Sequence, residues 1–305
     1  MTDLPDVVFS TPEMSAIFCG QSRVQRMLDF EAALARAEAR AGIVPADAAA
    51  AIADRCDAAA FDLDALFEST SITGTLAVPL VQALTELLDD GAKGFVHWGA
   101  TSQDAIDTGA VLQMRDGLDA IIDDLLHTGR SCLDVAESHR HTPMVGRTLL
   151  QHALPITLGL KAAHWLSAIT RRIERLRQLR GELVMQFGGA AGTLAALGDD
   201  GVRVAEFLAE ELNLELPDMP WHTDRDRIGD IAAALAVVAG TAGKIAHDIT
   251  LLKQTEVHEA NISGEGVSSA MPHKRNPVKG TLAAASVELA LGATHTVVSA
   301  MVQEH

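Results

Sequence analysis

The chain has 305 residues, of which 48% are hydrophobic and only 4% aromatic, and its formal net charge at pH 7 is −17. A protein this acidic repels nucleic-acid phosphates, which argues against nucleic acid as a partner. Its three scattered cysteines, without a CxxC or HExxH pattern, predict neither a disulfide framework nor a metal site.

The N-terminal part of the chain is predicted to be helical. The opening MTDLPDVVFS lacks a basic stretch followed by an apolar run, so we expect no signal peptide and a cytoplasmic protein. No stretch of about 18 uninterrupted apolar residues predicts a membrane span. A helix is predicted from about Pro12 to Arg40, ending before Gly42, and shorter helical pieces follow to about Leu88.

Longer helices are predicted in the remainder, at about 104–140, 155–187, 201–212 and 228–252, and from Pro277 onward. Between Ile228 and Leu252, apolar residues recur at alternating spacings of three and four, which is typical of helices packed at a shallow angle. Long Ala-rich helices seldom bury both faces within one monomer. We therefore predict an all-α, long-helix bundle that is completed by association of subunits.

We place an N-terminal helical domain at residues 1–103 and the central bundle domain at 104–305. The final MVQEH lies within a helical run and shows no cap signal, so we expect a C-terminal helical domain to be absent from this chain.

Three polar segments interrupt the long helical runs: HWGATSQD (97–104), GRTLLQHALPITLG (146–159) and GEGVSSAMPHKRNPVKG (264–280). One such segment alone could be an ordinary solvated connection. Three of them at the ends of long helices can converge on one pocket.

The third segment is locally cationic in an acidic protein. Asn276 and Pro277 predict a helix cap followed by the first helical residue, where backbone amides carry partial positive charge. Lys274, Arg275 and Lys279 add to that charge, which indicates an anion site. Ser268 and Ser269 lie where a hydroxyl could reach a bound substrate.

SSAMPHKRNP resembles the signature Gly-Ser-Ser-x-Met-Pro-x-Lys-x-Asn-Pro of the fumarase/aspartase superfamily. HWGATSQD and GRTLLQHALPITLG resemble two further regions of that superfamily, in the same order. The resemblance implies a homotetramer with a helical bundle and active sites composed of three subunits. It also implies β-elimination, or the reverse addition, through an aci-carboxylate intermediate, with Ser268 as the proton-transfer residue.

Two positions depart from the superfamily pattern. Val267 replaces the glycine before the serines, and Leu149 replaces the histidine of Gly-Arg-Thr-His. An amine leaving group needs protonation, whereas a carboxylate does not, because its conjugate acid has a pKa of about 4. Leu149 therefore favours lactone formation and opening. Together with PWHTDRDR (220–227), it points to the superfamily's cycloisomerase branch, whose members lactonise 3-carboxy-cis,cis-muconate in protocatechuate catabolism.

The resemblance and the three segments together give the candidate site. The catalytic candidates are Ser268 and Lys274. The substrate-binding candidates are His97, Thr101, Ser102, Gln103, Arg147, Thr148, Gln151, His152, Ser269, Met271 and Asn276. We expect a small di- or tricarboxylate substrate, no metal ion and no cofactor, because lysine and helix amides can stabilise the enediolate.

Alternative interpretations stay open at this point. His97 could be a structural histidine rather than a substrate ligand. The chain could be an adenylosuccinate-type lyase, which Leu149 disfavours. It could also be a non-catalytic homologue that keeps only the bundle, which retention of Ser268, Lys274 and Asn276 disfavours.

Overall fold

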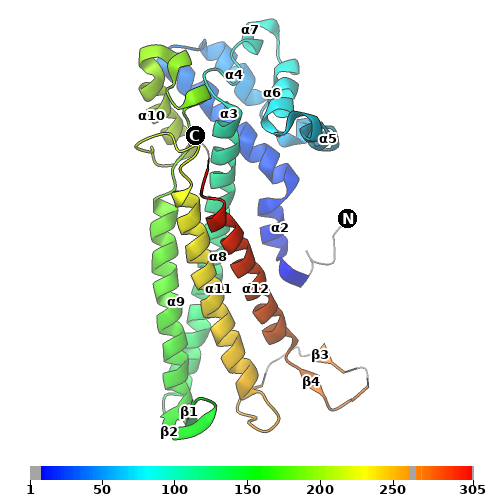
Figure 1. Cartoon of the computed structure of the whole chain (residues 1–305), viewed down its shortest axis with the longest axis vertical. Coiled ribbons are helices and arrows are strands. Elements are labelled where there is room, and N and C mark those ends of the chain that lie inside the picture. Colours follow the sequence, from blue (N-terminus) through cyan, green and yellow to red (C-terminus); the bar gives the residue numbers. More distant parts are fainter. Residues whose placement is uncertain (1–7, 262–265, 269, 304–305) are drawn as a thin grey trace. The chain divides into compact units, whose positions relative to one another are not determined.

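The computed structural model describes residues 8–261, 266–268 and 270–303 of the chain, and this part is mostly helical (Figure 1). The elements in chain order are α2 (Pro12–Phe18), α3 (Gly20–Ala41), α4 (Ala46–Asp54), η1 (Ala58–Ala60), α5 (Leu63–Thr73), α6 (Ala77–Glu86), α7 (Asp90–Lys93), α8 (Ser102–Ser138), β1 (Pro143–Thr148), β2 (Gln151–Thr157), α9 (Leu158–Gly181), η2 (Gly189–Ala191), η3 (Ala195–Asp200), α10 (Gly201–Leu212), α11 (Asp226–Leu252), β3 (Gly266–Val267), β4 (Arg275–Asn276) and α12 (Val278–Ser299). The predicted helical fold class is confirmed.

The chain divides into two compact units. The short-helix unit contains Thr11–Ala120 and Arg180–Asp224. The long-helix unit contains Ile121–Leu179 and all of the described chain from Arg225 onward. Helix α8 contributes residues to both units. The domain boundary expected between residues 103 and 104 stays a prediction.

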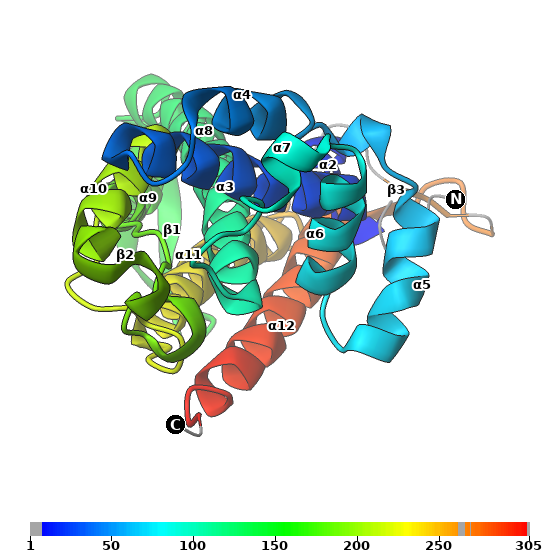
Figure 2. The ribbon, with the colours of Figure 1, turned by 90° about the horizontal axis from the view of Figure 1, so that it is seen from above.

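The short-helix unit is built around α3, which packs against α4 and α10 (Figure 2). Apolar residues along α3, such as Leu28 and Leu34, are almost completely buried, and Phe30 lies 6.5 Å from Phe187, ring centroid to ring centroid. These side chains leave water on folding, and that burial is the main stabilising contribution to this unit. Two acidic residues, Glu31 and Glu38, are buried on the same helix.

The helix predicted from Pro12 to Arg40 is interrupted in the structure. Cys19 adopts an extended backbone, ends α2 and caps the start of α3, with its sulfur accepting a hydrogen bond from the backbone amide of Ser22. The single-helix prediction was wrong at this point, because Gly20 is a poor helix former and the chain breaks just before it.

The long-helix unit contains α9, α11 and α12, which lie side by side in Figure 1, together with the C-terminal part of α8. Helices α11 and α12 approach closely through glycines: a Cβ on Gly243 would meet Val287, and one on Gly280 would meet Thr250. The seam predicted from Ile228 to Leu252 lies within α11, which the structure confirms as a helix.

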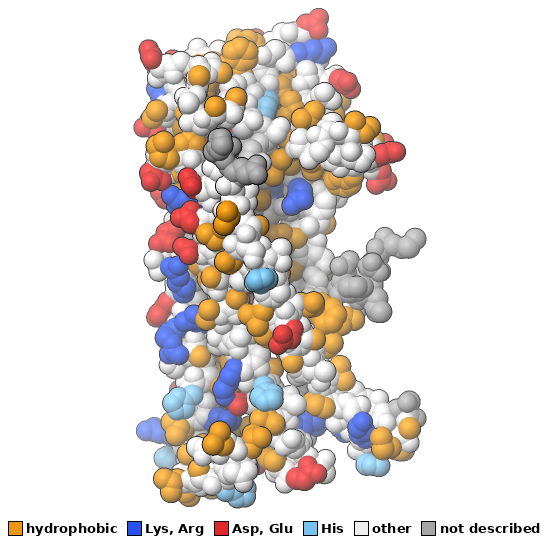
Figure 3. Space-filling view, in the orientation of Figure 1, with side chains coloured by type: hydrophobic (Ala, Val, Ile, Leu, Met, Phe, Trp, Pro, Cys, Tyr) orange, Lys and Arg blue, Asp and Glu red, His pale blue; other side chains and the backbone are white. Residues whose placement is uncertain are grey.

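Most of that apolar surface is not covered by the chain itself. Along the seam, Ile231 and Leu252 are buried, the other positions are partly or fully exposed, and no described residue of α12 is buried. Hydrophobic side chains are scattered along this face in Figure 3. Both α11 and α12 are long and apolar enough to cross a membrane by length and composition alone. However, Lys244 and Asp248 in the C-terminal part of α11 would be costly in lipid.

The sequence did not predict the two hairpins. Strands β1 and β2 pair antiparallel around a two-residue turn, Leu149–Leu150, in which both residues have positive φ angles of 49° and 63°. Such turns normally use Asn or Gly, so a Leu-Leu pair gives no hairpin signal. Strands β3 and β4 form a second, shorter pair, with Gly266 opposite Asn276 and Val267 opposite Arg275.

Candidate active site

The segment 97–104 carries four of the predicted site residues within the short-helix unit. His97 lies in the turn before α8, Thr101 immediately precedes this helix, and Ser102 and Gln103 form its first turn. All four side chains are half-buried. Gln103 donates a hydrogen bond from Nε2 to Oδ1 of Asp107, at 2.8 Å. The segment therefore presents polar groups from a fixed helix start.

The buried side chain of Asp104 holds this segment in place. Its side chain is fully buried, and its two oxygens accept hydrogen bonds from the backbone amides of Thr101, Gly188 and Gly189 at 2.9–3.0 Å. It also accepts from Nε2 of Gln186 at 3.0 Å and lies 2.8 Å from Nε2 of His222. A buried carboxylate with this many donors is stabilised by charge-assisted hydrogen bonds. Asp104 therefore ties helix α8 to the Gly-rich turn at 188–189.

His97 forms an ion pair with a buried glutamate of α3. Its Nδ1 lies 2.6 Å from Oε1 of Glu31, whose side chain is almost completely buried. Burial by itself lowers the pKa of His97, but the charge and hydrogen bond of Glu31 and the charge of Asp104 outweigh it and raise the pKa overall. The backbone of His97 is in the left-handed region, with φ at 57°. Its position is thus imposed by the surroundings.

The hairpin of the long-helix unit carries four more predicted residues. Arg147 makes two hydrogen bonds to Glu259, from Nη1 at 2.7 Å and Nη2 at 2.9 Å. Thr148, Gln151 and His152 are exposed. The hydrogen bond from Arg147, its charge and those of neighbouring cations outweigh the effect of burial and lower the pKa of Glu259. Arg147 is therefore paired with a carboxylate of the same chain.

A cavity of about 390 Å³ lies beside this hairpin. Arg147, Leu149 and Lys161 line it, together with residues at the end of α11 and just after it, such as Leu252 and Val257. Leu149, at the position that departs from the superfamily pattern, is 95% exposed. An apolar group there offers neither a proton donor nor an acceptor.

The segment around β3 and β4 carries the catalytic candidates. Ser268 is half-buried, and its Oγ accepts hydrogen bonds from the backbone amides of Met271 at 3.1 Å and Ala270 at 3.4 Å. Amides directed at this oxygen favour negative charge on it. Met271 and Lys274 are exposed, and among the described residues Lys274 has no ion-pair partner. Ser269 lies outside the described residues.

The predicted helix cap at Asn276 is wrong by one residue. Asn276 belongs to β4, Pro277 is the N-cap of α12, and no side-chain hydrogen bond caps this helix. Its backbone amides nevertheless follow the cationic segment directly, as the sequence predicted.

The chain alone does not gather the candidates of the long-helix unit into one pocket. The hairpin β1–β2 and the pair β3–β4 project from different helices and are separate in Figures 1 and 2. Among the residues that the structure describes, no hydrogen bond or ion pair links them. His97, Thr101, Ser102 and Gln103 belong to the other unit.

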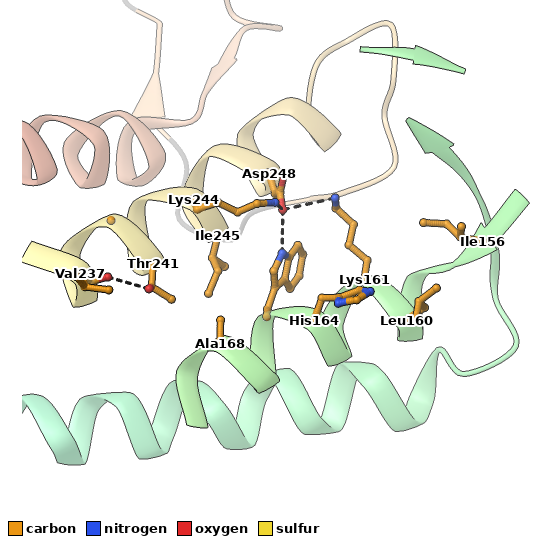
Figure 4. A pocket seen from close by; sticks show the side chains of 12 residues that line it. Ile156, Leu160, Lys161, His164, Ala168, Val237, Thr241, Lys244, Ile245 and Asp248 are labelled. Carbon is orange, nitrogen blue, oxygen red and sulfur yellow. Dashed lines mark hydrogen bonds and ion pairs between the residues drawn. The ribbon is translucent and has the colours of Figure 1, made fainter. Parts of the chain in front are cut away.

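A larger cavity, of about 740 Å³, lies between α9 and α11 (Figure 4). Its lining is mainly apolar, and Asp248 is contacted there by Trp165 Nε1 at 2.8 Å, by Lys161 at 3.4 Å and by Lys244. None of the predicted site residues lines it. It shares Ile156, Lys161 and Asp248 with the cavity beside the hairpin.

Reasoning from the sequence missed four residues that organise these groups: Glu31, Asp104, His222 and Glu259. Asp104 and His222 lie within stretches that the sequence singled out, HWGATSQD and PWHTDRDR. Glu31 and Glu38 are seven residues apart, so they share a helix face with buried apolar residues, and that spacing was the available signal. Glu259 carries no comparable signal.

The comparisons with known proteins show the family to which the chain belongs. A family model described as lyase matches residues 7–288. The 3-carboxy-cis,cis-muconate cycloisomerases of Bradyrhizobium diazoefficiens and Pseudomonas aeruginosa are 51% and 50% identical, over 98% and 100% of this chain and 68% and 69% of theirs. The crystal structure of the 3-carboxy-cis,cis-muconate lactonizing enzyme from Pseudomonas putida superposes with a TM-score of 0.92 at 50% identity, covering 99% of this chain and 68% of that one. The chain therefore belongs to the lyase family of the fumarase/aspartase superfamily.

Proposed function

We propose that the chain is a cycloisomerase that interconverts 3-carboxy-cis,cis-muconate and its carboxymuconolactone in protocatechuate catabolism. The observation that carries this proposal is identity of about half the residues, over nearly the whole chain, to enzymes of that name from two organisms. Leu149 supports it, because the reaction expels or adds a carboxylate and needs no acid at that position.

In the proposed reaction, one substrate carboxylate attacks the conjugated double bond and a carbon–oxygen bond forms. The displaced electron pair moves onto the neighbouring carboxylate and gives an aci-carboxylate. Lys274, Asn276 and the start of α12 stabilise this charge, with Met271 and Ser269 completing the segment. Ser268 then gives its proton to carbon. The backbone amides of Ala270 and Met271 stabilise the resulting alkoxide until it takes a proton from water, which restores Ser268.

The remaining candidates bind the other carboxylates. In this proposal the segment 97–104 donates hydrogen bonds to a carboxylate from Thr101, Ser102, Gln103 and His97. Arg147, Thr148, Gln151 and His152 do so from the hairpin. Arg147 already gives two of its five N–H groups to Glu259 and one to the carbonyl of Val145, so it meets a substrate carboxylate with its remaining donors or by releasing Glu259.

The active site in this proposal is composed of three subunits of a cytoplasmic homotetramer. Two observations support assembly: α12 has no buried residue among those described, and the candidate residues of the long-helix unit lie on separate hairpins. Association would cover the apolar faces of α11 and α12 with other helices, so these faces need no membrane. Sedimentation at micromolar concentration should give a tetramer, and a monomer would contradict the composite site.

Activity tests the proposed function directly. The protein is incubated separately with 3-carboxymuconate and with adenylosuccinate, and the ultraviolet absorbance of each is followed. We expect loss of absorbance with 3-carboxymuconate only. Turnover of adenylosuccinate would favour the lyase alternative, and absence of turnover with both would favour a non-catalytic homologue. The domain division at residues 103 and 104 remains part of the proposal.

A further inference from the structure

We infer that Glu31 is a positioning residue for catalysis. It orients the ring of His97 and keeps it as an imidazolium, so that Nε2–H donates a hydrogen bond to a substrate carboxylate. This inference rests on the proposed function, in which His97 binds substrate. Glu31 itself does not contact substrate, since it is buried within the short-helix unit.

The geometry commits one ring nitrogen. Nδ1 of His97 lies 2.6 Å from Oε1 of Glu31, a short, charge-assisted contact between α3 and the turn that precedes α8. An ionised carboxylate can only accept, so the Nδ1 proton points to Glu31. Within the described part of the chain, Nε2 has no hydrogen-bond partner, and 16% of the side chain is exposed. Nε2 is therefore the nitrogen that remains for a ligand.

The charges that face His97 all favour the imidazolium. Glu31 approaches from α3 and Asp104 from α8, and both raise the pKa of His97 against the opposing effect of burial. His222 lies against Asp104 on the far side of that carboxylate and is the other titratable group of this network. Oε2 of Glu31 is buried without a partner in the described residues, so His97 is the compensation for the charge of Glu31.

Glu38 provides a matched control on the same helix. It is also fully buried, and neither of its carboxylate oxygens has a partner among the described residues. Burial, assisted by the charge of Glu31, raises the pKa of Glu38 to about 9, so Glu38 is neutral at pH 7. Replacing it with glutamine removes no charge from the surroundings of His97.

The first experiment follows the imidazole directly and does not depend on turnover. Histidine labelled with carbon-13 and nitrogen-15 is titrated by NMR in the full chain, and the signal of His97 is assigned by its absence in His97→Asn. In the wild-type protein we expect His97 to titrate above the ordinary histidine range. The titration should move to lower pH in Glu31→Gln and stay unchanged in Glu38→Gln. A wild-type His97 that titrates at or below the ordinary range would overturn the inference, even if Glu31→Gln failed to fold.

The second experiment measures KM and kcat for 3-carboxymuconate from pH 6 to 9. In the wild-type enzyme KM should rise as His97 loses its proton. In Glu31→Gln this rise should begin at lower pH, with KM at pH 7 increased by roughly tenfold and kcat much less affected. Glu31→Asp, which keeps the charge, should recover part of the loss. A uniform fall in kcat with an unchanged pH profile would indicate a merely structural role and overturn the inference. If the wild-type protein turns over no 3-carboxymuconate, the proposed function fails, while the NMR titration still decides the state of His97.

Discussion

Two segments that carry the candidate site are held in opposite ways. The segment 97–104 is held by two buried carboxylates. Asp104, within the segment, binds Gln186, and Glu31 of α3 binds His97, so both contacts join parts of the short-helix unit that are far apart in sequence. Among the described residues from Gly266 to Asn276, the backbone is held by a two-residue strand pair and by local hydrogen bonds to Ser268, and Val267 is 70% exposed.

The difference indicates a division of roles within the site. Groups that bind the substrate carboxylates in the ground state gain from being preorganised, since ordering them costs free energy on each binding event. A proton-transfer group must meet its carbon after substrate has entered, so its segment gains from being free of deep anchors. In this scheme the short-helix unit provides the fixed donors, and the segment around Ser268 provides the chemistry.

The largest expected effect is the fall in kcat on removal of the proton-transfer group. Ser268→Ala should lower kcat by roughly 10²–10⁴ with nearly unchanged KM, because a positioned acid or base acts in the transition state. Lys274→Ala should impair both kcat and KM, since its charge meets a carboxylate before and during reaction. Ser269→Ala should be milder than Ser268→Ala. Steady-state kinetics decide this, and near-normal kcat in Ser268→Ala would make His97 or His152 the next candidate.

Removing the anchor of the other segment should act on stability instead. Asp104→Asn keeps the size of the side chain but replaces one acceptor oxygen with a donor. At the Oδ1 position this donor faces Gly188 N–H and His222, and at the Oδ2 position it faces the N–H groups of Thr101 and Gly189. We expect a loss of about 3 kcal/mol in the free energy of unfolding. Chemical denaturation measures it, with Asp124→Asn, on the exposed surface of α8, as control. If the two variants were equally stable, Asp104 would not hold the segment 97–104, and the contrast with the segment around Ser268 would be lost.

The buried carboxyl group of Glu38 should make the free energy of unfolding depend on pH. Its pKa is about 9 in the folded protein and near 4.5 when solvated, so folding takes up a proton between these values and stability falls as pH rises through this window. Glu38→Gln removes this dependence. Its stability advantage over the wild-type protein should grow by about 1 kcal/mol per pH unit between pH 6 and 8. Denaturation midpoints at the two pH values check this, and a constant difference between the proteins would show that Glu38 is ionised in the fold.

Much of the helical framework could be predicted from the sequence, because local signals specify it. The run Gly201–Leu212 has the bounds of α10, and the apolar seam from Ile228 to Leu252 lies within α11. The hairpin β1–β2 could not be predicted, since its Leu149–Leu150 turn lacks the residues that normally mark one. Helix ends are specified less sharply than helix interiors, as the misplaced cap at Asn276 illustrates.

The candidate site was predictable only as far as its motifs reach. The motifs contain His97 and Asp104 but do not reveal what holds them. Glu31 is 66 residues from His97, and His222 is 118 residues from Asp104. Such pairs form only through tertiary packing, so one sequence without its fold gives no sign of them. In the proposed function further subunits bring the hairpin candidates beside Ser268, and the fold of one chain does not specify that arrangement.

The smallest expected effect is that of metal removal, and it tests whether side chains alone supply the charge in both segments. The carboxylates near the candidates already have partners: Asp104 has its buried donors, Glu31 has His97 and Glu259 has Arg147. Among the described residues, no group of three His, Cys, Asp or Glu side chains is placed to hold a metal ion. The enediolate charge then falls to Lys274 and backbone amides, which need no Lewis acid. Dialysis against EDTA should therefore leave kcat and KM for 3-carboxymuconate unchanged. If activity were lost and then restored by a divalent cation, the charge assigned to Lys274 would belong to the metal, and Lys274→Ala should then affect binding more than turnover.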